Sequence, residues 1–258
     1  MTVLQAIILG IIQGLSEFLP ISSSGHLALT LGLMNIDEGL LFTVVVHVGT
    51  LIPVIIVFRK DILALIKKPF QKMTYLLIVA TIPAAIVALF FDDMIEAAFT
   101  SFNFIAIGFI ITGIVLILTD RLKRNTKKSE DISWLDAALI GLAQAVAVFP
   151  GISRSGSTIA AALSRGIDRE AAAKFAFLMS IPAILGALLV KIISVVRGDI
   201  LIEEINFIVL GAGFITAALS GYLAINFMLA AIKKAKLSYF AYYVLILSGL
   251  VFIGYMFI

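Results

Sequence analysis

The sequence has no cysteine, and only 14% of its 258 residues are charged. The absence of cysteine excludes a disulfide framework and any metal site built on thiolates. Charged residues make up about 25% of an ordinary soluble domain. Because 62% of this chain is hydrophobic, a water-soluble fold of this length could not bury the apolar surface. The composition therefore indicates an integral membrane protein.

The N-terminus also lacks the features of a cleaved signal peptide. No basic residue precedes the first apolar stretch, and that stretch contains the polar residues Gln13 and Glu17. A cleaved signal has a basic start and an uninterrupted apolar centre. We therefore expect the first apolar stretch to belong to the folded protein.

Six stretches are long and apolar enough to cross a bilayer, which takes roughly 17–25 residues. They lie near residues 41–58, 73–91, 103–119, 175–196, 205–230 and 239–258. Two further apolar regions, 3–34 and 134–163, are interrupted by proline, glycine and serine. Proline ends helices, and serine hydroxyls compete with helical backbone bonding. We expect each of these two regions to be a broken helix.

The basic residues are concentrated on one side of the predicted spans. Most of the 19 lysines and arginines lie in four loops, at residues 59–72, 121–128, 165–174 and 233–236. The loops on the other side are mainly acidic. By the positive-inside rule the basic loops are cytoplasmic. The basic pI of 9.1 therefore reflects topology and does not indicate a nucleic-acid surface.

The same charges constrain the two broken regions. Basic loops stand both before and after residues 134–163, so the chain must enter and leave the membrane there on one side. Thirty residues are too few for two full spans at about 1.5 Å per residue, and a re-entrant hairpin fits better. Region 3–34 is then the mirror hairpin on the outer side. Irregular backbone at membrane depth needs shielding by protein or a cavity, so both breaks should line an interior site.

The two halves of the chain resemble each other. When Gly10 is aligned with Gly141, the serine motifs that begin at Ser22 and Ser153 coincide without a gap. Residues 1–128 and 129–258 then each form one re-entrant hairpin followed by three spans, and an odd number of spans gives the halves opposite orientation. We predict an all-α polytopic fold, a single membrane domain built as an inverted-topology repeat, with its site at the repeat interface. Chance similarity between two Gly/Ser-rich loops is the alternative.

Glu17 and Arg154 are the two full charges that remain deep in the chain once the loops are assigned, and each lies in one break. An ionisable residue at membrane depth is costly and marks a candidate functional site. If the hairpins meet, the two charges can meet. A structural ion pair between the halves is the alternative, but it would not explain the hydroxyl groups nearby.

Both breaks carry hydroxyl side chains ahead of an expected helix. They are Ser22, Ser23 and Ser24 in the first break, and Ser153, Ser155, Ser157 and Thr158 in the second. A Ser/Gly loop that leads into a helix directs backbone N–H groups and the positive end of the helix dipole at one place, which suits an anion. Arg154 adds a planar donor pair that matches phosphate oxygens. Helix capping is the simpler interpretation, but it needs one hydroxyl per helix and no arginine.

Gln13 and Glu17 lie four residues apart, on one helix face that leads into the first serine loop. Their oxygens could hold a hard divalent cation together with water and a substrate phosphate, or Glu17 could act as a general base. Gln13 could instead make a buried interhelical hydrogen bond. His26 closes the loop, where it could activate a serine or protonate a leaving oxygen; a packing role is the alternative. For His47, inside 41–58, we expect a structural or substrate-lining role.

These motifs resemble the signatures of a known family, the bacterial undecaprenyl-diphosphate phosphatases of the bacitracin-resistance type. The first signature is similar to Gly10-x-x-Gln13-Gly14-x-x-Glu17-x-x-Pro20-x-Ser22-Ser23-Ser24-Gly25-His26. The second is similar to Pro150-Gly151-Ile152-Ser153-Arg154-Ser155-Gly156-Ser157-Thr158. The two motifs stand in the family's order, and the resemblance covers essentially the whole chain.

The resemblance implies removal of the terminal phosphate from undecaprenyl diphosphate in the bacterial inner membrane, which recycles the lipid carrier for cell-wall synthesis and gives bacitracin resistance. It implies a divalent metal, Mg²⁺ or Ca²⁺, near Gln13 and Glu17, and a site that opens to the outer face. It also implies catalytic roles for Ser23 and His26. The implied phosphate-binding residues are Ser153, Arg154 and Thr158, to which the serine loops add Ser22, Ser24 and Ser155. Gln13 stands where some members have a second carboxylate.

The expected reaction is attack on the terminal phosphorus by Ser23, with Glu17 or His26 taking its proton, or by a water activated by Glu17. Arg154, the helix N-termini and a cation would neutralise the diphosphate. The alternative is a transporter or flippase of a phosphorylated polyprenyl lipid, because inverted repeats with broken helices are also transporter architecture. The sequence leaves open the metal, the prenyl chain length and whether the protein forms a homodimer.

Overall fold

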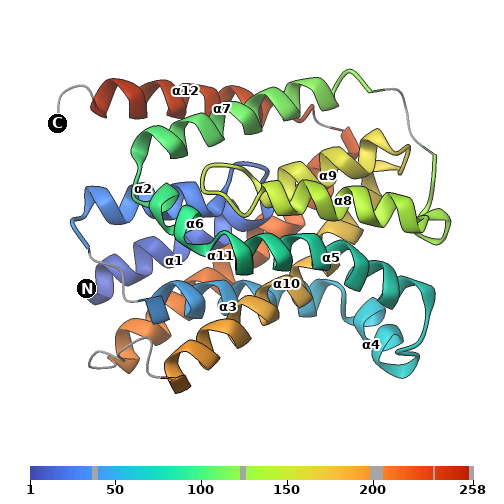
Figure 1. Ribbon diagram of the computed structural model, residues 1–258, viewed down its shortest axis with the longest axis horizontal. Coiled ribbons are helices and arrows are strands. Elements are labelled where there is room, and N and C mark those ends of the chain that lie inside the picture. The colour runs from blue at the N-terminus through green and yellow to red at the C-terminus, as the bar shows by residue number, and fades with distance from the viewer. Residues whose placement is uncertain (37–39, 123–125, 198–205, 235, 256–258) are drawn as a thin grey trace.

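The computed structural model describes residues 1–36, 40–122, 126–197, 206–234 and 236–255. In these residues the chain is helical, apart from turns and an isolated bridge between Lys127 and Ile167. The helices are α1 (Val3–Phe18), α2 (Ser23–Leu33), α3 (Leu40–Val57), α4 (Arg59–Lys67), α5 (Lys72–Phe90), α6 (Asp92–Phe99), α7 (Phe102–Thr119), α8 (Trp134–Val146), α9 (Arg154–Ser164), α10 (Arg169–Arg197), α11 (Phe207–Lys234) and α12 (Ser238–Tyr255), with a short 3-10 helix η1 at Ser129–Asp131. Figure 1 shows them side by side in one bundle.

The expected all-helical membrane fold is confirmed. Within the described residues, α5, α7, α10 and α11 are long and apolar enough to cross a membrane. The bent pair of α3 and α4 counts as a fifth candidate, and α12 is a shorter apolar helix. All six stretches that we expected to span the membrane therefore hold a helix, although length and composition support four or five of them as spans.

In both broken regions the chain turns back on itself between two short helices. Residues 19–22 join α1 to α2, and residues 147–153 join α8 to α9. Pro20 and Pro150 lie in these turns, where a residue without an N–H cannot continue the helix. Gly151 has φ +85°, and a Cβ there would clash with the carbonyl of Ile105, so this turn requires glycine.

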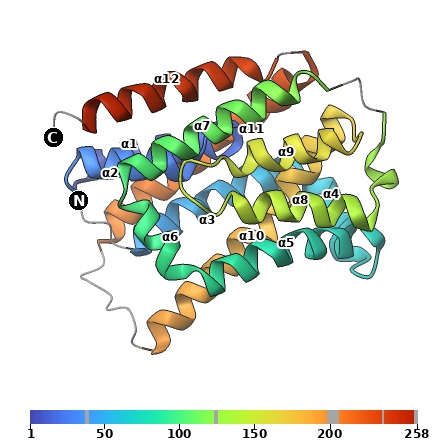
Figure 2. The ribbon, with the colours of Figure 1, turned by 45° about the horizontal axis from the view of Figure 1, so that its top comes forward.

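Helix packing brings the two turns into the interior. α1 packs mainly against α11, α8 against α5, and α7 against α12, as Figures 1 and 2 show. At Gly10 and Gly14 a Cβ would overlap Thr216 and Ser220 of α11. Small residues four apart let two membrane helices approach closely. This close approach fixes the position of α1, and therefore of Glu17, along α11.

A buried carboxylate fixes the start of the second hairpin. Asp136 is fully buried and accepts hydrogen bonds from Lys127 Nζ at 3.1 Å, Arg165 Nε at 2.9 Å and the Ser133 N–H at 3.0 Å. Lys127 precedes α8 and Arg165 follows α9. The carboxylate therefore ties together the two ends of the α8–α9 hairpin, whose second helix begins at Arg154.

Candidate active site

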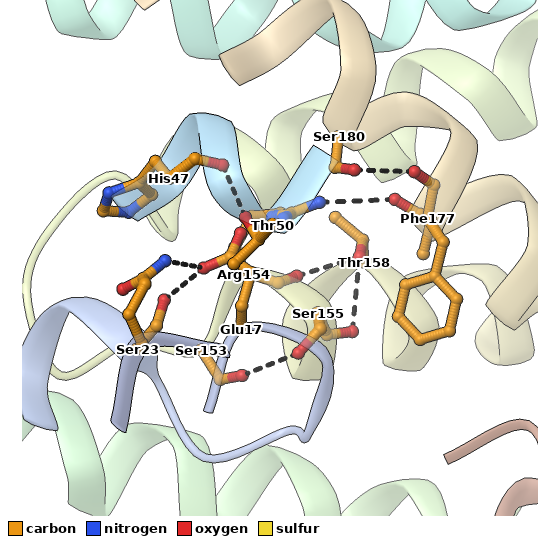
Figure 3. Close-up of polar contacts among 12 residues, drawn as sticks. Glu17, Ser23, His47, Thr50, Ser153, Arg154, Ser155, Thr158, Phe177 and Ser180 are labelled. Carbon is orange, nitrogen blue, oxygen red and sulfur yellow. Dashed lines mark hydrogen bonds and ion pairs between the residues drawn. The ribbon is translucent and has the colours of Figure 1, made fainter. Parts of the chain in front are cut away.

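The two charges from the two broken regions form an ion pair. Nη2 of Arg154, the first residue of α9, lies 2.5 Å from Oε1 of Glu17, near the end of α1 (Figure 3). Nη1 of Arg154 donates to the Ala176 carbonyl at 3.4 Å. The Glu17 residue is 7% exposed and the Arg154 side chain 18%. A carboxylate this deeply buried is costly unless it is paired, so the pairing explains how both charges are accommodated.

The second carboxylate oxygen of Glu17 accepts two further hydrogen bonds. Ser23 Oγ donates to Oε2 at 2.5 Å, and Gln13 Nε2 donates to the same oxygen at 3.0 Å. Figure 3 shows the Ser23 hydroxyl and the Arg154 guanidinium directed at the one carboxylate. A serine whose proton already points at a carboxylate is arranged for general-base activation. The structure thus brings together Gln13, Glu17, Ser23 and Arg154.

Gln13 has the oxygen that a cation site would need. Its side chain is fully buried, and Oε1 has no hydrogen-bond partner while Nε2 is used on Glu17. No group of three or more His, Cys, Asp or Glu that could hold a metal occurs in the part of the chain that the structure describes. The protein could therefore offer one carboxylate and one amide oxygen. This set fits Mg²⁺ in particular, which usually takes few protein ligands and completes its shell with water and substrate phosphate.

The first turn is strained where it leads into α2. Ser22 has φ 70°, a conformation that costs a residue other than glycine on the order of 1–3 kcal/mol and is often found at functional sites. Its Oγ accepts from the Gly25 N–H at 3.3 Å, which caps α2, and lies 3.2 Å from Ser24 Oγ. The next residue, Ser23, then has its hydroxyl on Glu17.

The second turn is fastened to the first and to α7. Ser155 Oγ donates to the Leu19 carbonyl at 2.9 Å, which joins the two turns directly. The Ser153 N–H donates to Thr112 Oγ1, and that hydroxyl donates to the Gly151 carbonyl, both at 2.9 Å. These bonds fix the loop that immediately precedes Arg154. No local pattern distinguishes Thr112, which lies in the apolar α7.

The hydroxyls of Ser153, which precedes α9, and of Thr158, within α9, bond to the backbone of α9 itself. Ser153 Oγ accepts from the Gly156 N–H at 3.1 Å and caps α9. Thr158 Oγ1 donates to the Arg154 carbonyl at 2.8 Å and is also 3.3 Å from the Ser155 carbonyl oxygen. Capping by serine is thus present, as the simpler interpretation expected. It accounts for Ser153, whereas Ser155 bonds across to the first turn.

His26 makes its contacts away from Glu17. Nδ1 lies 2.8 Å from the Ser22 carbonyl oxygen and Nε2 lies 2.8 Å from the hydroxyl of Tyr243 on α12. The imidazole stacks on the Tyr243 ring with centroids 5.6 Å apart, and Phe109 packs edge-on at 5.2 Å. Both ring nitrogens therefore have partners other than Ser23. Sequence reasoning missed Tyr243, because a tyrosine in an apolar span carries no local signal.

His47 of α3 lies beside the Glu17 cluster (Figure 3). Its Nδ1 is 2.8 Å from the Thr43 carbonyl oxygen. The sequence offered no carboxylate near His47 along the chain, and only the packing of α3 against α1 brings one close in space.

The fold and the site define a class: a multi-pass helical membrane protein with a carboxylate, a serine and an arginine held together where two broken helices meet. Comparison with known proteins shows the family. The chain belongs to the family described as bacitracin resistance protein BacA, whose model matches residues 6–250. The resemblance seen in the two motifs is therefore confirmed.

Relatives match this chain over almost all of its length. It is 49% identical over 245 residues to an undecaprenyl-diphosphatase of Carboxydothermus hydrogenoformans, covering 95% of this chain and 94% of that protein. It is 48% identical over 242 residues to undecaprenyl-diphosphatase 4 of Bacillus cereus, covering 93% of each chain. An undecaprenyl-diphosphatase of Alkaliphilus metalliredigens is 41% identical over 263 residues, covering 94% of this chain and 95% of that protein.

Proposed function

We propose that this protein hydrolyses undecaprenyl diphosphate to undecaprenyl phosphate and inorganic phosphate, which returns the lipid carrier to cell-wall synthesis and confers bacitracin resistance. Its membership of the bacitracin resistance family and its close similarity to named undecaprenyl-diphosphatases support this activity. The observation that carries the chemistry is the Ser23 hydroxyl on the Glu17 carboxylate, beside the Arg154 guanidinium.

Substrate binding uses Arg154. In this proposal the prenyl tail lies in lipid between the helices and the diphosphate enters between the two turns. A guanidinium has five N–H donors, and Arg154 uses one on Glu17 and one on the Ala176 carbonyl. The remaining donors can hold the phosphate oxygens, and the arriving negative charge competes with Glu17 for the arginine. Weakening the ion pair makes the Glu17 carboxylate a stronger base.

Ser23 is the nucleophile in this mechanism. Its Oγ forms a bond to the terminal phosphorus while its proton moves to Glu17 Oε2, 2.5 Å away. The bond between that phosphorus and the bridging oxygen breaks, and undecaprenyl phosphate leaves with the electron pair. Glu17 passes the proton from Ser23 to the departing oxygen of undecaprenyl phosphate. It then takes a proton from the water that attacks the phosphoserine, and returns that proton to Ser23 Oγ as inorganic phosphate leaves. The alternative is direct attack by a water that Glu17 activates.

The cation would be held by the Glu17 carboxylate and the Gln13 amide oxygen. A bound Mg²⁺ or Ca²⁺ would neutralise charge on the phosphate oxygens. The buried, unpartnered Oε1 of Gln13 supports this assignment. In this proposal the protein's own residues position the ion, while Arg154 and Ser23 act on the phosphoryl group itself.

The inverted repeat is also a proposal, and the packing supports it. If residues 1–128 and 129–258 are related by symmetry, α1 corresponds to α8, α5 to α11 and α7 to α12. α1 packs on α11, and the corresponding helices α8 and α5 pack on each other. α7 and α12, which correspond to each other, also pack together. A two-fold relation between the halves requires this pattern of pairs. The basic loops would then be cytoplasmic in the bacterial plasma membrane, with the site open to the outside.

Cysteine labelling can test this topology cleanly, because the chain has no cysteine of its own. Lys68→Cys and Lys127→Cys should react with an impermeant reagent only after the cells are opened. Asp93→Cys, at the opposite end, should react in intact cells. Labelling of Lys127→Cys in intact cells would contradict the proposed orientation.

The activity is tested by phosphate release from undecaprenyl diphosphate, with the purified protein in detergent and with or without a chelator. We expect release that the chelator abolishes and added Mg²⁺ or Ca²⁺ restores. If the folded wild-type protein released no phosphate but moved the lipid across vesicle membranes, it would be a flippase and the hydrolase proposal would be wrong.

A further inference from the structure

Helix α4 leaves the bundle at a sharp angle. It is bent by 87° from α3 and lies at one end of the molecule (Figure 1). None of its residues is fully buried, and Leu63 and Ile66 are 52% and 68% exposed. Phe70, just beyond the helix, is 85% exposed. A short helix that lies across the end of a membrane span with its apolar residues exposed is typical of the membrane interface.

The sides of α4 differ as an interfacial helix requires. Ile62 and Leu65 pack against the main hydrophobic core and attach the helix to the bundle. Lys60 and Lys67 are exposed. They lie about two helical turns apart and so share a face, which is the one opposite Ile62 and Leu65. α4 is therefore attached to the protein on one side, basic on another, and apolar and uncovered between them.

An open groove of about 370 Å³ lies where α3, α4 and α11 meet. Arg59, Lys60, Asp61 and Tyr222 are among the residues that line it. The charge of Asp61 is already balanced by Lys174 Nζ at 2.6 Å. Among the described residues, by contrast, neither Arg59 nor Lys60 has an ion-pair partner. The groove thus has two uncompensated positive charges at the end of a membrane span.

We propose that this groove binds the headgroup of an anionic phospholipid of the cytoplasmic leaflet. The lipid phosphate lies between Arg59 and Lys60, the Tyr222 hydroxyl donates to it, and the acyl chains cover Leu63 and Ile66. Tyrosine is enriched at the membrane–water interface, and cytoplasmic leaflets attract basic residues electrostatically. The inference uses the orientation proposed above but does not depend on the phosphatase chemistry.

Lipid binding to the purified protein tests the proposal directly. Native mass spectrometry in detergent can measure the affinities for dioleoyl phosphatidylglycerol and dioleoyl phosphatidylcholine separately. The test variant is Arg59→Gln/Lys60→Gln. The matched control is Lys234→Gln/Lys236→Gln, which removes two exposed positive charges from another basic loop outside the groove. Lys60→Glu, a reversal at an exposed position, is a second test variant.

We expect the wild type to prefer phosphatidylglycerol. Each Lys or Arg near an anionic lipid surface contributes about 1 kcal/mol, so the double variant should bind phosphatidylglycerol about 25-fold more weakly. Binding of phosphatidylcholine and phosphate release should not change, and the control should behave as wild type. An unchanged preference in both test variants, or an equal loss in the control, would overturn the proposal. Inorganic phosphate that displaced the lipid at equal concentration would assign the groove to a free anion instead.

Discussion

The substitution Glu17→Gln tests whether the Glu17 carboxylate acts in catalysis or only stabilises the fold. Glu17 accepts three charge-assisted hydrogen bonds, from Ser23, Gln13 and Arg154. A glutamine cannot take a proton from Ser23, and its amide group must face at least one of these donors with its own N–H. Positioned general bases accelerate reactions by about 10²- to 10⁴-fold. We therefore expect kcat for phosphate release to decrease by a factor of this size.

The same substitution should also destabilise the protein. Arg154 has a mostly buried side chain, and removing its partner leaves a buried charge unpaired, which costs about 3–5 kcal/mol. Replacing both members of such a pair is often close to neutral. We therefore expect Glu17→Gln/Arg154→Met to recover much of the lost stability in thermal unfolding and to remain inactive.

The control for both variants is Ser16→Ala. Ser16 is buried next to Glu17 on α1, but its hydroxyl donates to the Ile12 carbonyl and not to the cluster. The rate of Ser16→Ala should stay within about twofold of wild type, because the lost hydrogen bond contributes only about 1 kcal/mol to stability and does not touch the cluster. Wild-type turnover by Glu17→Gln would refute the base assignment. Recovery of activity by the double variant would show that the pair is purely structural.

Further predictions concern Arg154, Asp136, Asp168 and Gly14. Arg154→Lys should lower kcat/KM by about 10- to 100-fold, because a charge-assisted hydrogen bond of about 1.5–3 kcal/mol is lost; wild-type kinetics would contradict this. Asp136→Asn should destabilise by about 1–3 kcal/mol, because its charge-assisted hydrogen bonds weaken while Lys127 and Arg165 stay partly exposed to solvent; thermal unfolding measures this, and kcat per folded molecule should be retained. Burial raises the pKa of Asp168, but hydrogen bonds and the charge of Lys128 outweigh burial and hold that pKa below its usual 3.8. The ionised Asp168 therefore stabilises the folded protein above pH 3.8, and this contribution is lost as the pH falls below that value. Asp168→Asn should flatten the acid limb of a plot of unfolding free energy against pH. Gly14→Val should overpack the contact with Ser220 and cost about 1–3 kcal/mol, measured by unfolding in detergent; unchanged stability would show that the helices can separate.

The fold could be predicted from local features of the sequence. Apolar length locates the helices, and Pro20 and Pro150 mark the two breaks, because each of these signals acts within a few residues. The meeting of Glu17 with Arg154 could also be anticipated, since two buried charges of opposite sign stabilise each other only when they are adjacent.

The remaining parts of the site depend on how distant helices pack, which local patterns do not encode. Tyr243 contacts His26 because α12 lies against α7, and His47 lies beside the Glu17 cluster because α3 packs against α1. Asp136 is buried because Lys127 and Arg165 close over it from both ends of the hairpin. Each contact joins segments whose relative positions follow from the assembled bundle.

The most direct test of the account is the rate of phosphate release from undecaprenyl diphosphate by Ser23→Ala, measured beside wild type and Ser16→Ala. If Ser23 is the nucleophile that Glu17 activates, the rate should fall by about 10²-fold or more in Ser23→Ala and stay near wild type in Ser16→Ala. A Ser23→Ala protein that folds normally and releases phosphate at the wild-type rate would contradict the proposed mechanism.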